Sequence, residues 1–247
     1  MGKEREKIIE GKSNCPFCIP RGHSFLKYYG ISQFAASNYI IESGSFFVKP
    51  NILPVNDQGS HLLLIPKTHL TSLAQVEDRE DEIRSILLRL RYLIGDFAIF
   101  EHGSFKEGSN NQSIYHSHAH IIGNIDGYDI IRYFEDVLNG GLNSEEIYPY
   151  KIYQGNDDIL GFHRNLIGIV GENKDSCSSY LYIQQNNLCM VSFDSDNNMR
   201  SQVIQRAMGR FFGQELDWKK IINGSDYEQM MAARRIANLY RLLSFFY

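Results

Sequence analysis

The stretch Gln112-Ser113-Ile114-Tyr115-His116-Ser117-His118-Ala119-His120-Ile121-Ile122 carries three of the chain's eight histidines at every second position. Alternate side chains of a β-strand point to the same face, so we expect the three imidazoles to line one face of a strand. The small residues between them and the β-branched pair after them favour that strand. Because each buried ring nitrogen needs a partner, aligned histidines fill a core poorly. The pattern therefore indicates metal binding, or phosphoryl or acyl chemistry.

Two further motifs precede the histidines. One is His61-Leu62-Leu63-Leu64-Ile65-Pro66-Lys67-Thr68-His69, and the other is Cys15-Pro16-Phe17-Cys18. Together with H-x-H-x-H and its two following isoleucines, they resemble the histidine triad superfamily of nucleotidyl hydrolases and transferases. The second motif is similar to the family's G-H-x-L-x-I-P-K-x-H strand, with Ser60 in place of the glycine. The cysteine motif is found in zinc-carrying members. The resemblance covers roughly residues 14–125.

The resemblance implies an α+β fold with a histidine triad-type antiparallel sheet and flanking helices in residues 1–126. Residues 127–247 are expected to form a C-terminal α+β extension packed on it. Alternating or apolar runs predict strands at 45–48, 62–65, 98–103, 167–170, 180–183 and 189–193. Amphipathic runs predict helices at 71–95, 130–138, 202–212 and 227–246, the first of them beginning at Thr71 or Ser72.

The Cys15-x-x-Cys18 pair alone is compatible with zinc, with redox chemistry or with two free thiols. A redox pair normally follows the strand of a βαβ unit, which this sequence does not indicate. Zinc requires two further ligands. In zinc-bearing relatives these are the histidine after I-P-K-x and the first triad histidine. The resemblance thus implies a structural zinc site formed by Cys15, Cys18, His69 and His116.

The resemblance also implies a covalent mechanism, in which the central histidine, His118, attacks the α-phosphorus of a nucleotide. Neutral imidazole is a competent nucleophile near neutral pH when its other nitrogen is hydrogen-bonded, usually to a carbonyl. His120 and Gln112 would donate to the non-bridging oxygens, where charge accumulates.

Six more residues are candidates for contacts with the nucleotide or the rest of the substrate. Asn51 lies in the loop that meets the ribose in the family, and Lys67 and Arg206 are candidate phosphate-binding cations. Glu101 belongs to an E-H-G triplet of a longer subgroup. Ser201 and Gln202 begin that subgroup's S-Q-x-x-x-R pattern.

The composition of the 247 residues bounds the possible partners. A net charge of −4 provides no basic excess for a general nucleic-acid surface. No apolar run has the length of a membrane span, and the charged N-terminus is not followed by the apolar segment of a signal peptide. Four cysteines do not suggest a disulfide framework. We therefore expect a cytoplasmic protein with a nucleotide or nucleotide-conjugate substrate, and a homodimer is compatible with these features.

Several functions share these motifs. The first is a nucleotide phosphohydrolase or nucleotidyltransferase, and the second is a dinucleoside polyphosphate phosphorylase. A third is a zinc-stabilised nucleotide-binding protein without turnover. The fourth is a zinc hydrolase whose metal is held by the three triad histidines, with Glu101 as an additional acidic ligand. The sequence does not identify the leaving group.

Overall fold

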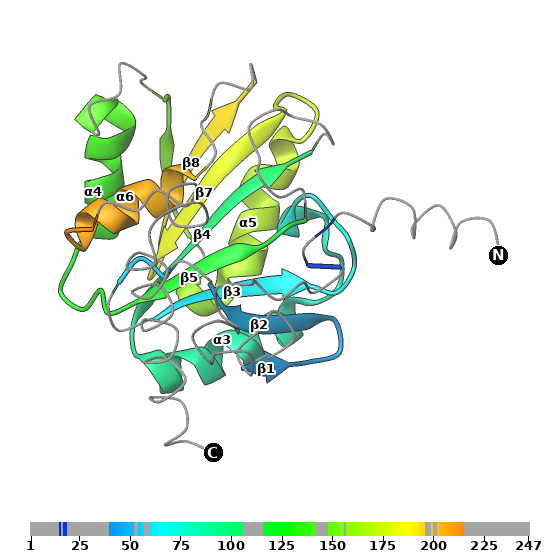
Figure 1. Cartoon of the computed structure of the whole chain (residues 1–247). Helices are drawn as coiled ribbons and strands as arrows, with labels where there is room; N and C mark the ends of the chain where they lie inside the picture. The colour runs from blue at the N-terminus through cyan, green and yellow to red at the C-terminus, as the bar shows by residue number, and fades with distance from the viewer. Residues whose placement is uncertain are drawn as a thin grey trace.

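A computed structural model of the chain describes residues 15, 17–18, 40–51, 54–56, 60–105, 116–141, 148–155, 157–195, 199 and 202–214 (Figure 1). Two candidate site residues, Gln112 and Ser201, lie outside the described residues, as does the helix expected at 227–246. None of the helices in the described ranges is long and apolar enough to cross a membrane.

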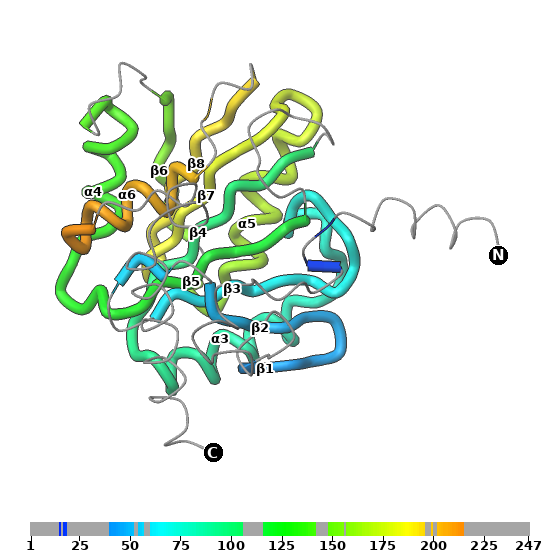
Figure 2. The backbone as a smooth tube through the Cα atoms, in the orientation of Figure 1, coloured from blue at the N-terminus to red at the C-terminus, as the bar shows by residue number. Residues whose placement is uncertain are grey.

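The described strands form one antiparallel sheet of eight, in the order β1-β2-β3-β5-β4-β7-β8-β6. Their bounds are β1 Ile41–Glu42, β2 Phe46–Pro50, β3 His61–Pro66, β4 Phe97–Ser104, β5 Ala119–Gly123, β6 Lys151–Gln154, β7 Ser179–Gln185 and β8 Leu188–Asp194. Strand β4 pairs with β5 on one side and with β7 on the other. The C-terminal half therefore continues the sheet of the N-terminal half, as the backbone in Figure 2 shows. The division of the chain near residue 126 stays a prediction.

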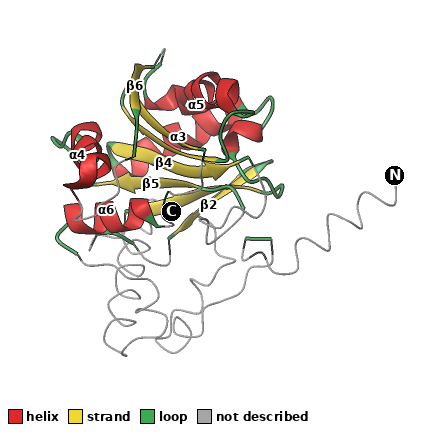
Figure 3. Ribbon diagram, turned by 90° about the horizontal axis from the view of Figure 1, so that it is seen from above, coloured by secondary structure: helices red, strands yellow, loops and turns green. Residues whose placement is uncertain are grey.

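Helices cover both faces of this sheet (Figure 3). Helices α3 (Glu80–Ile94) and α5 (Phe162–Val170) pack on one face, and α4 (Ile130–Asp136) and α6 (Val203–Phe211) pack on the other. Helix α3 buries one stripe, and full burial of each such side chain contributes roughly 1.5–3 kcal/mol. The stripe consists of Ile83, Ile86, Leu87 and Leu90. Shorter helical turns are Leu73–Gln75, Val137–Gly141, Ile159–Gly161 and Gly171–Asn173. The predicted α+β class, with an antiparallel sheet and flanking helices, is confirmed.

Side chains of the triad segment point alternately to the two faces of the sheet. Ala119 and Ile121 of β5 belong to the core under α3 and α5. Because neighbouring side chains alternate along a strand, His120 points to the other face, with Ile122. We call the surface under α3 and α5 the α3 face, and the surface that carries His120 the triad face.

Three expected elements differ in the structure. The strand expected to carry all three triad histidines, β5, begins only at Ala119, so His116 and His118 precede it. The helix predicted over 71–95 is broken: Ser72 caps the short turn Leu73–Gln75, and α3 begins only at Glu80, where three acidic residues occupy its first turn. The strand predicted at 167–170 is wrong, because these residues end helix α5. A four-residue apolar run does not separate a strand from a buried helix, and α5 buries every fourth residue, namely Phe162, Leu166 and Val170.

Candidate metal centre and histidine site

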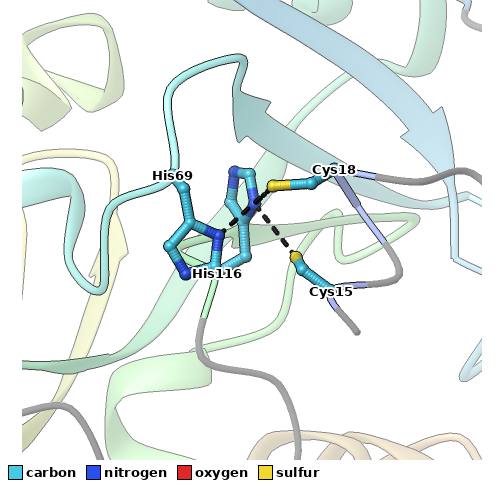
Figure 4. Close-up of side chains that lie close together, drawn as sticks. All are labelled: Cys15, Cys18, His69 and His116. Carbon is cyan, nitrogen blue, oxygen red and sulfur yellow. Dashed lines mark hydrogen bonds between the residues drawn. The ribbon is translucent and has the colours of Figure 1, made fainter. Parts of the chain in front are cut away.

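Four metal-binding side chains converge from three distant segments (Figure 4). The potential ligand atoms of Cys15, Cys18, His69 and His116 all lie within 4.8 Å of one another. Nδ1 of His116 is 3.3 Å from Sγ of Cys15 and 3.4 Å from Sγ of Cys18. Nδ1 of His69 is 3.3 Å from Sγ of Cys18. The structure thus brings together the whole set that the resemblance implied.

The geometry of this cluster fits a tetrahedral ion. Bonds of about 2.3 Å to sulfur and about 2.0–2.1 Å to nitrogen would place unlike ligands about 3.5 Å apart. Three of the four sulfur–nitrogen pairs have a spacing of 3.3–3.4 Å. Nε2 of His116 lies 2.7 Å from the carbonyl oxygen of Pro66. Because a carbonyl only accepts, Nε2 carries the proton and Nδ1 presents its lone pair to the cluster. A metal-binding histidine usually makes this kind of outer hydrogen bond.

Phe17, between the two cysteines, connects the metal cluster with the triad. Its ring packs edge-on against His116 and His118, with centroid distances of 5.7 and 5.2 Å. The ammonium of Lys49 lies 5.7 Å from the same ring. The segment that carries the two cysteines therefore also packs against the triad histidine His118.

His118 has the hydrogen bond expected of a nucleophilic imidazole. It lies just before β5, and its ring centroid is 5.0 Å from that of His120. Its Nδ1 donates to the carbonyl oxygen of His116 at 2.8 Å. Nδ1 therefore carries the proton and Nε2 the lone pair. Burial lowers the pKa of His118 below its ordinary value, and the hydrogen bond to the carbonyl partly opposes this shift.

His120 belongs to a second pair of imidazoles. Its Nδ1 is 2.8 Å from Nε2 of His61, and Nδ2 of Asn51 is 3.1 Å from the same His61 nitrogen. Nε2 of His61 thus shares its hydrogen-bonding contacts between the amide of Asn51 and Nδ1 of His120. Burial, followed by the charges of His118, His61 and His102, lowers the pKa of His120 well below its usual range.

His61 and Lys49 were missed as site residues in the sequence. His61 opens the motif that ends at His69, from which only Lys67 and His69 were expected to be site residues. Lys49 pairs in register with Leu63, which pairs with His120, so these three residues form a row across β2, β3 and β5 on the triad face. Lys49 is buried, and burial lowers the pKa of its ammonium to about 8. The signal available in the sequence was a lysine two positions before Asn51 in an otherwise apolar strand.

His102, within the E-H-G triplet, also faces the triad. It follows Phe100 by two residues on β4, and Phe100 pairs with His120. Burial, then the charge of His118, lowers the pKa of His102 to about 4, against the attraction of Asp194. The site thus includes uncharged imidazoles near neutral pH, a surrounding that favours an uncharged nucleophile.

Two other predicted substrate contacts, Lys67 and Arg206, are exposed to solvent. The ammonium of Lys67 is exposed and forms an ion pair of 2.9 Å with Glu42. Arg206 lies exposed on α6, one turn after Gln202, whose carbonyl accepts from the Arg206 amide at 2.9 Å. Both remain predictions as phosphate contacts, as does Gln202 as a leaving-group contact.

Glu101 does not lie on the triad face. Its carboxylate is fully buried on the α3 face, where it accepts hydrogen bonds from Leu73, Ser117 and Tyr180. This burial does not favour a direct contact between Glu101 and a substrate on the triad face, and that contact stays a prediction. The arrangement also does not favour one ion bound by all three triad histidines, because His116 joins the cysteines whereas His120 joins His61.

Comparison with known proteins gives matches at the level of structure. No protein-family model and no curated protein matches the sequence. The yeast Ap4A phosphorylase Apa2 in complex with AMP matches with 13% identity and a TM-score of 0.46, over 87% of this chain and 78% of that one. The same enzyme in complex with Ap4A matches with 12% identity and a TM-score of 0.40, over 74% and 65%.

A Zn-bound histidine triad family protein from Mycobacterium smegmatis matches with 17% identity and a TM-score of 0.30, over 67% of this chain and 99% of that one. One of the matched structures is thus a protein of the family that the motifs resemble.

Proposed function

We propose that this chain is a nucleotide phosphohydrolase or nucleotidyltransferase that acts at the α-phosphate through a nucleotidyl intermediate on His118. The observation that carries the proposal is the 2.8 Å hydrogen bond from His118 Nδ1 to the carbonyl oxygen of His116. It leaves the lone pair on Nε2, and the lowered pKa of the ring favours the neutral form that attacks phosphorus.

The reaction has two displacement steps. In the first, Nε2 of His118 attacks the α-phosphorus, a P–N bond forms, and the leaving-group oxygen departs with the electrons of the bond that breaks. In the second, an acceptor oxygen attacks phosphorus and loses its proton to solvent, and the P–N bond breaks to restore neutral His118. Water as the acceptor makes the chain a hydrolase, and inorganic phosphate would make it a phosphorylase.

His120 and Gln112 are proposed to stabilise the charge on the non-bridging oxygens. Nδ1 of His120 lies against Nε2 of His61, which leaves Nε2 of His120 for the substrate. From this nitrogen His120 would donate to a non-bridging oxygen as negative charge accumulates there. Asn51 is proposed to contact the ribose next to His61.

The metal is proposed to be zinc with a structural role. Cys15, Cys18, His69 and His116 would provide two thiolates and two imidazoles, a closed set that stabilises the fold and leaves no position for substrate. The ion would hold these segments together and would take no part in the reaction. The neighbouring packing of Phe17 on His118 supports this assignment.

A panel of α-labelled substrates tests the proposal. It contains a dinucleoside polyphosphate, a nucleotide sugar, a nucleoside phosphoramidate and an acyl-adenylate, each with and without inorganic phosphate. We expect wild-type protein to release a labelled mononucleotide from at least one, and His118→Asn to release none. Arg132→Gln, which changes an exposed residue of α4, is the control. Nucleotide binding without release from any substrate would contradict the proposal and favour a non-catalytic binding protein.

A further inference from the structure

The buried carboxylate of Glu101 joins three parts of the chain on the α3 face. Its Oε1 accepts from the backbone amide of Leu73 at 2.6 Å and from the hydroxyl of Ser117 at 3.0 Å. Its Oε2 accepts from the hydroxyl of Tyr180 at 2.7 Å. Ser117 lies between His116 and His118, Leu73 lies four residues after His69, and Tyr180 belongs to β7 of the C-terminal half.

The hydrogen bonds around this carboxylate have one consistent direction. Because Tyr180 donates to Glu101, the Ser72 hydroxyl, 2.6 Å away, donates to Tyr180. The oxygen of Ser72 in turn accepts from the amide of Ala74 at 3.0 Å. A fully satisfied buried network of this kind fixes the positions of its members, because removing one partner leaves a buried polar group unpaired.

Backbone hydrogen bonds next to the network also join these segments of the chain. The amide of Ser117 donates to the carbonyl of Leu70 at 2.6 Å, and the amide of Ser104 donates to the carbonyl of Thr71 at 3.0 Å. The triad segment is thus bound directly to the residues that follow His69.

Gly103 makes room for the contribution of Tyr180. A Cβ atom at position 103 would lie 2.3 Å from both Cζ and Oη of Tyr180. The E-H-G triplet therefore has three separate roles in the structure: Glu101 holds the network, His102 faces the triad, and Gly103 admits the tyrosine.

From these contacts we infer that Glu101 is a positioning residue, which holds Ser117, and with it the flanking His116 and His118, against the segment after His69 and against Tyr180 of the C-terminal half. This inference rests on the proposed function for its catalytic consequence. The C-terminal half then contributes to the geometry of the triad through the phenolic hydroxyl of Tyr180, which does not itself contact the substrate.

The sharpest test compares two tyrosines of the same strand. Tyr180→Phe removes the hydroxyl that donates to Glu101. Tyr182→Phe, the matched control, removes an equally buried hydroxyl of the same face that donates to Gln184. We expect Tyr180→Phe to lower kcat on the order of tenfold at unchanged KM, because displacement of a reacting group by a fraction of an ångström is costly. Tyr182→Phe should stay near the wild-type kcat.

A conservative pair at position 101 separates positioning from mere support of the fold. In Glu101→Gln the amide oxygen still accepts from Leu73 and Ser117, and the amide nitrogen can donate to Tyr180, whose proton then turns to Ser72. We expect this variant to keep kcat within about threefold of wild type, whereas Glu101→Ala should lose on the order of a hundredfold.

Amide hydrogen exchange provides a readout that does not depend on turnover. Peptides covering 70–76 and 116–123 should exchange faster in Tyr180→Phe than in Tyr182→Phe, with both variants folded. Equal exchange and equal kcat in the two variants would overturn the inference. If wild-type protein turned over no nucleotide, the proposed function would fail, and the exchange comparison would still decide whether Glu101 positions the triad segment.

Discussion

The triad face and the α3 face of the same short segment, residues 116–121, differ in what their side chains contact. On the triad face the rings of His118 and His120 lie beside other imidazoles and beside Phe17. On the α3 face, Ser117 meets a buried carboxylate, and Ala119 and Ile121 enter the apolar core. The triad face presents imidazole nitrogens to a ligand. The α3 face fixes the backbone that orients those imidazoles. Substitutions on the two faces should therefore affect different quantities.

The largest expected effects concern the triad face. His118→Asn should reduce turnover by several orders of magnitude, as expected when a covalent nucleophile is removed, with nucleotide affinity largely kept. His120→Asn should cost about a hundredfold to a thousandfold in kcat, the range for loss of one donor to a developing charge. Steady-state kinetics and equilibrium binding measure the two quantities separately. Equal losses in both variants would mean that the two imidazoles do not have distinct roles.

The metal cluster should affect stability more than chemistry. Cys15→Ser should lose the metal, measured as zinc per chain in the purified protein. If free metal exceeds its dissociation constant about a hundredfold, the bound ion contributes about 2.7 kcal/mol, which shifts Tm by roughly 5–10 °C in a chain of this size. Cys177→Ser, at a buried cysteine outside the cluster, is the control. Retention of zinc in Cys15→Ser, or loss of zinc when His118 is changed, would contradict the assignment of the four zinc ligands.

The buried Glu101 carboxyl on the α3 face should make the free energy of unfolding depend on pH. Burial raises the pKa of Glu101 from 4.5 to about 7, although its three hydrogen bonds oppose that shift. Between these values the folded state binds more protons than the unfolded state, so this group's contribution to stability falls as pH rises from about 4.5 to 7, by about 3 kcal/mol.

Comparison of wild type with Glu101→Gln isolates this effect. The buried histidines have lowered pKa values, so their contributions to stability change in the opposite direction over the same range. Glutamine does not titrate, so the stability of Glu101→Gln relative to wild type should rise between pH 4.5 and 7. Chemical denaturation at several pH values measures the difference. A constant difference across that range would show that the carboxyl does not titrate there.

Local patterns in the sequence indicated much of this site. The period of two separated the histidines from Ser117 and Ala119, and spaced motifs implied the four metal ligands that the structure brings together. Strands β3 and β4 followed from apolar runs. The strand predicted from the alternating histidines is shorter than expected, because β5 begins at Ala119.

What the sequence did not indicate depends on contacts between distant segments. Tyr180 lies 79 positions from Glu101, and nothing in the pattern of either strand marks the pair. Glu101 was expected to contact substrate because it belongs to a triplet before the triad, whereas strand alternation places it on the face opposite His102. The approach of Lys49 to the triad depends on the order β2-β3-β5, which only the folded sheet defines.

The central claim is that one imidazole on the triad face forms a covalent bond to phosphorus. The most direct test is to mix the protein with a substrate from the panel, quench within milliseconds in base, where phosphoramidates persist, and map the modified peptide by mass spectrometry. We expect one nucleoside monophosphate on the peptide that contains His118, localised to that residue, and none in His118→Asn. Normal turnover without any trapped adduct, together with substantial activity in His118→Asn, would contradict the account.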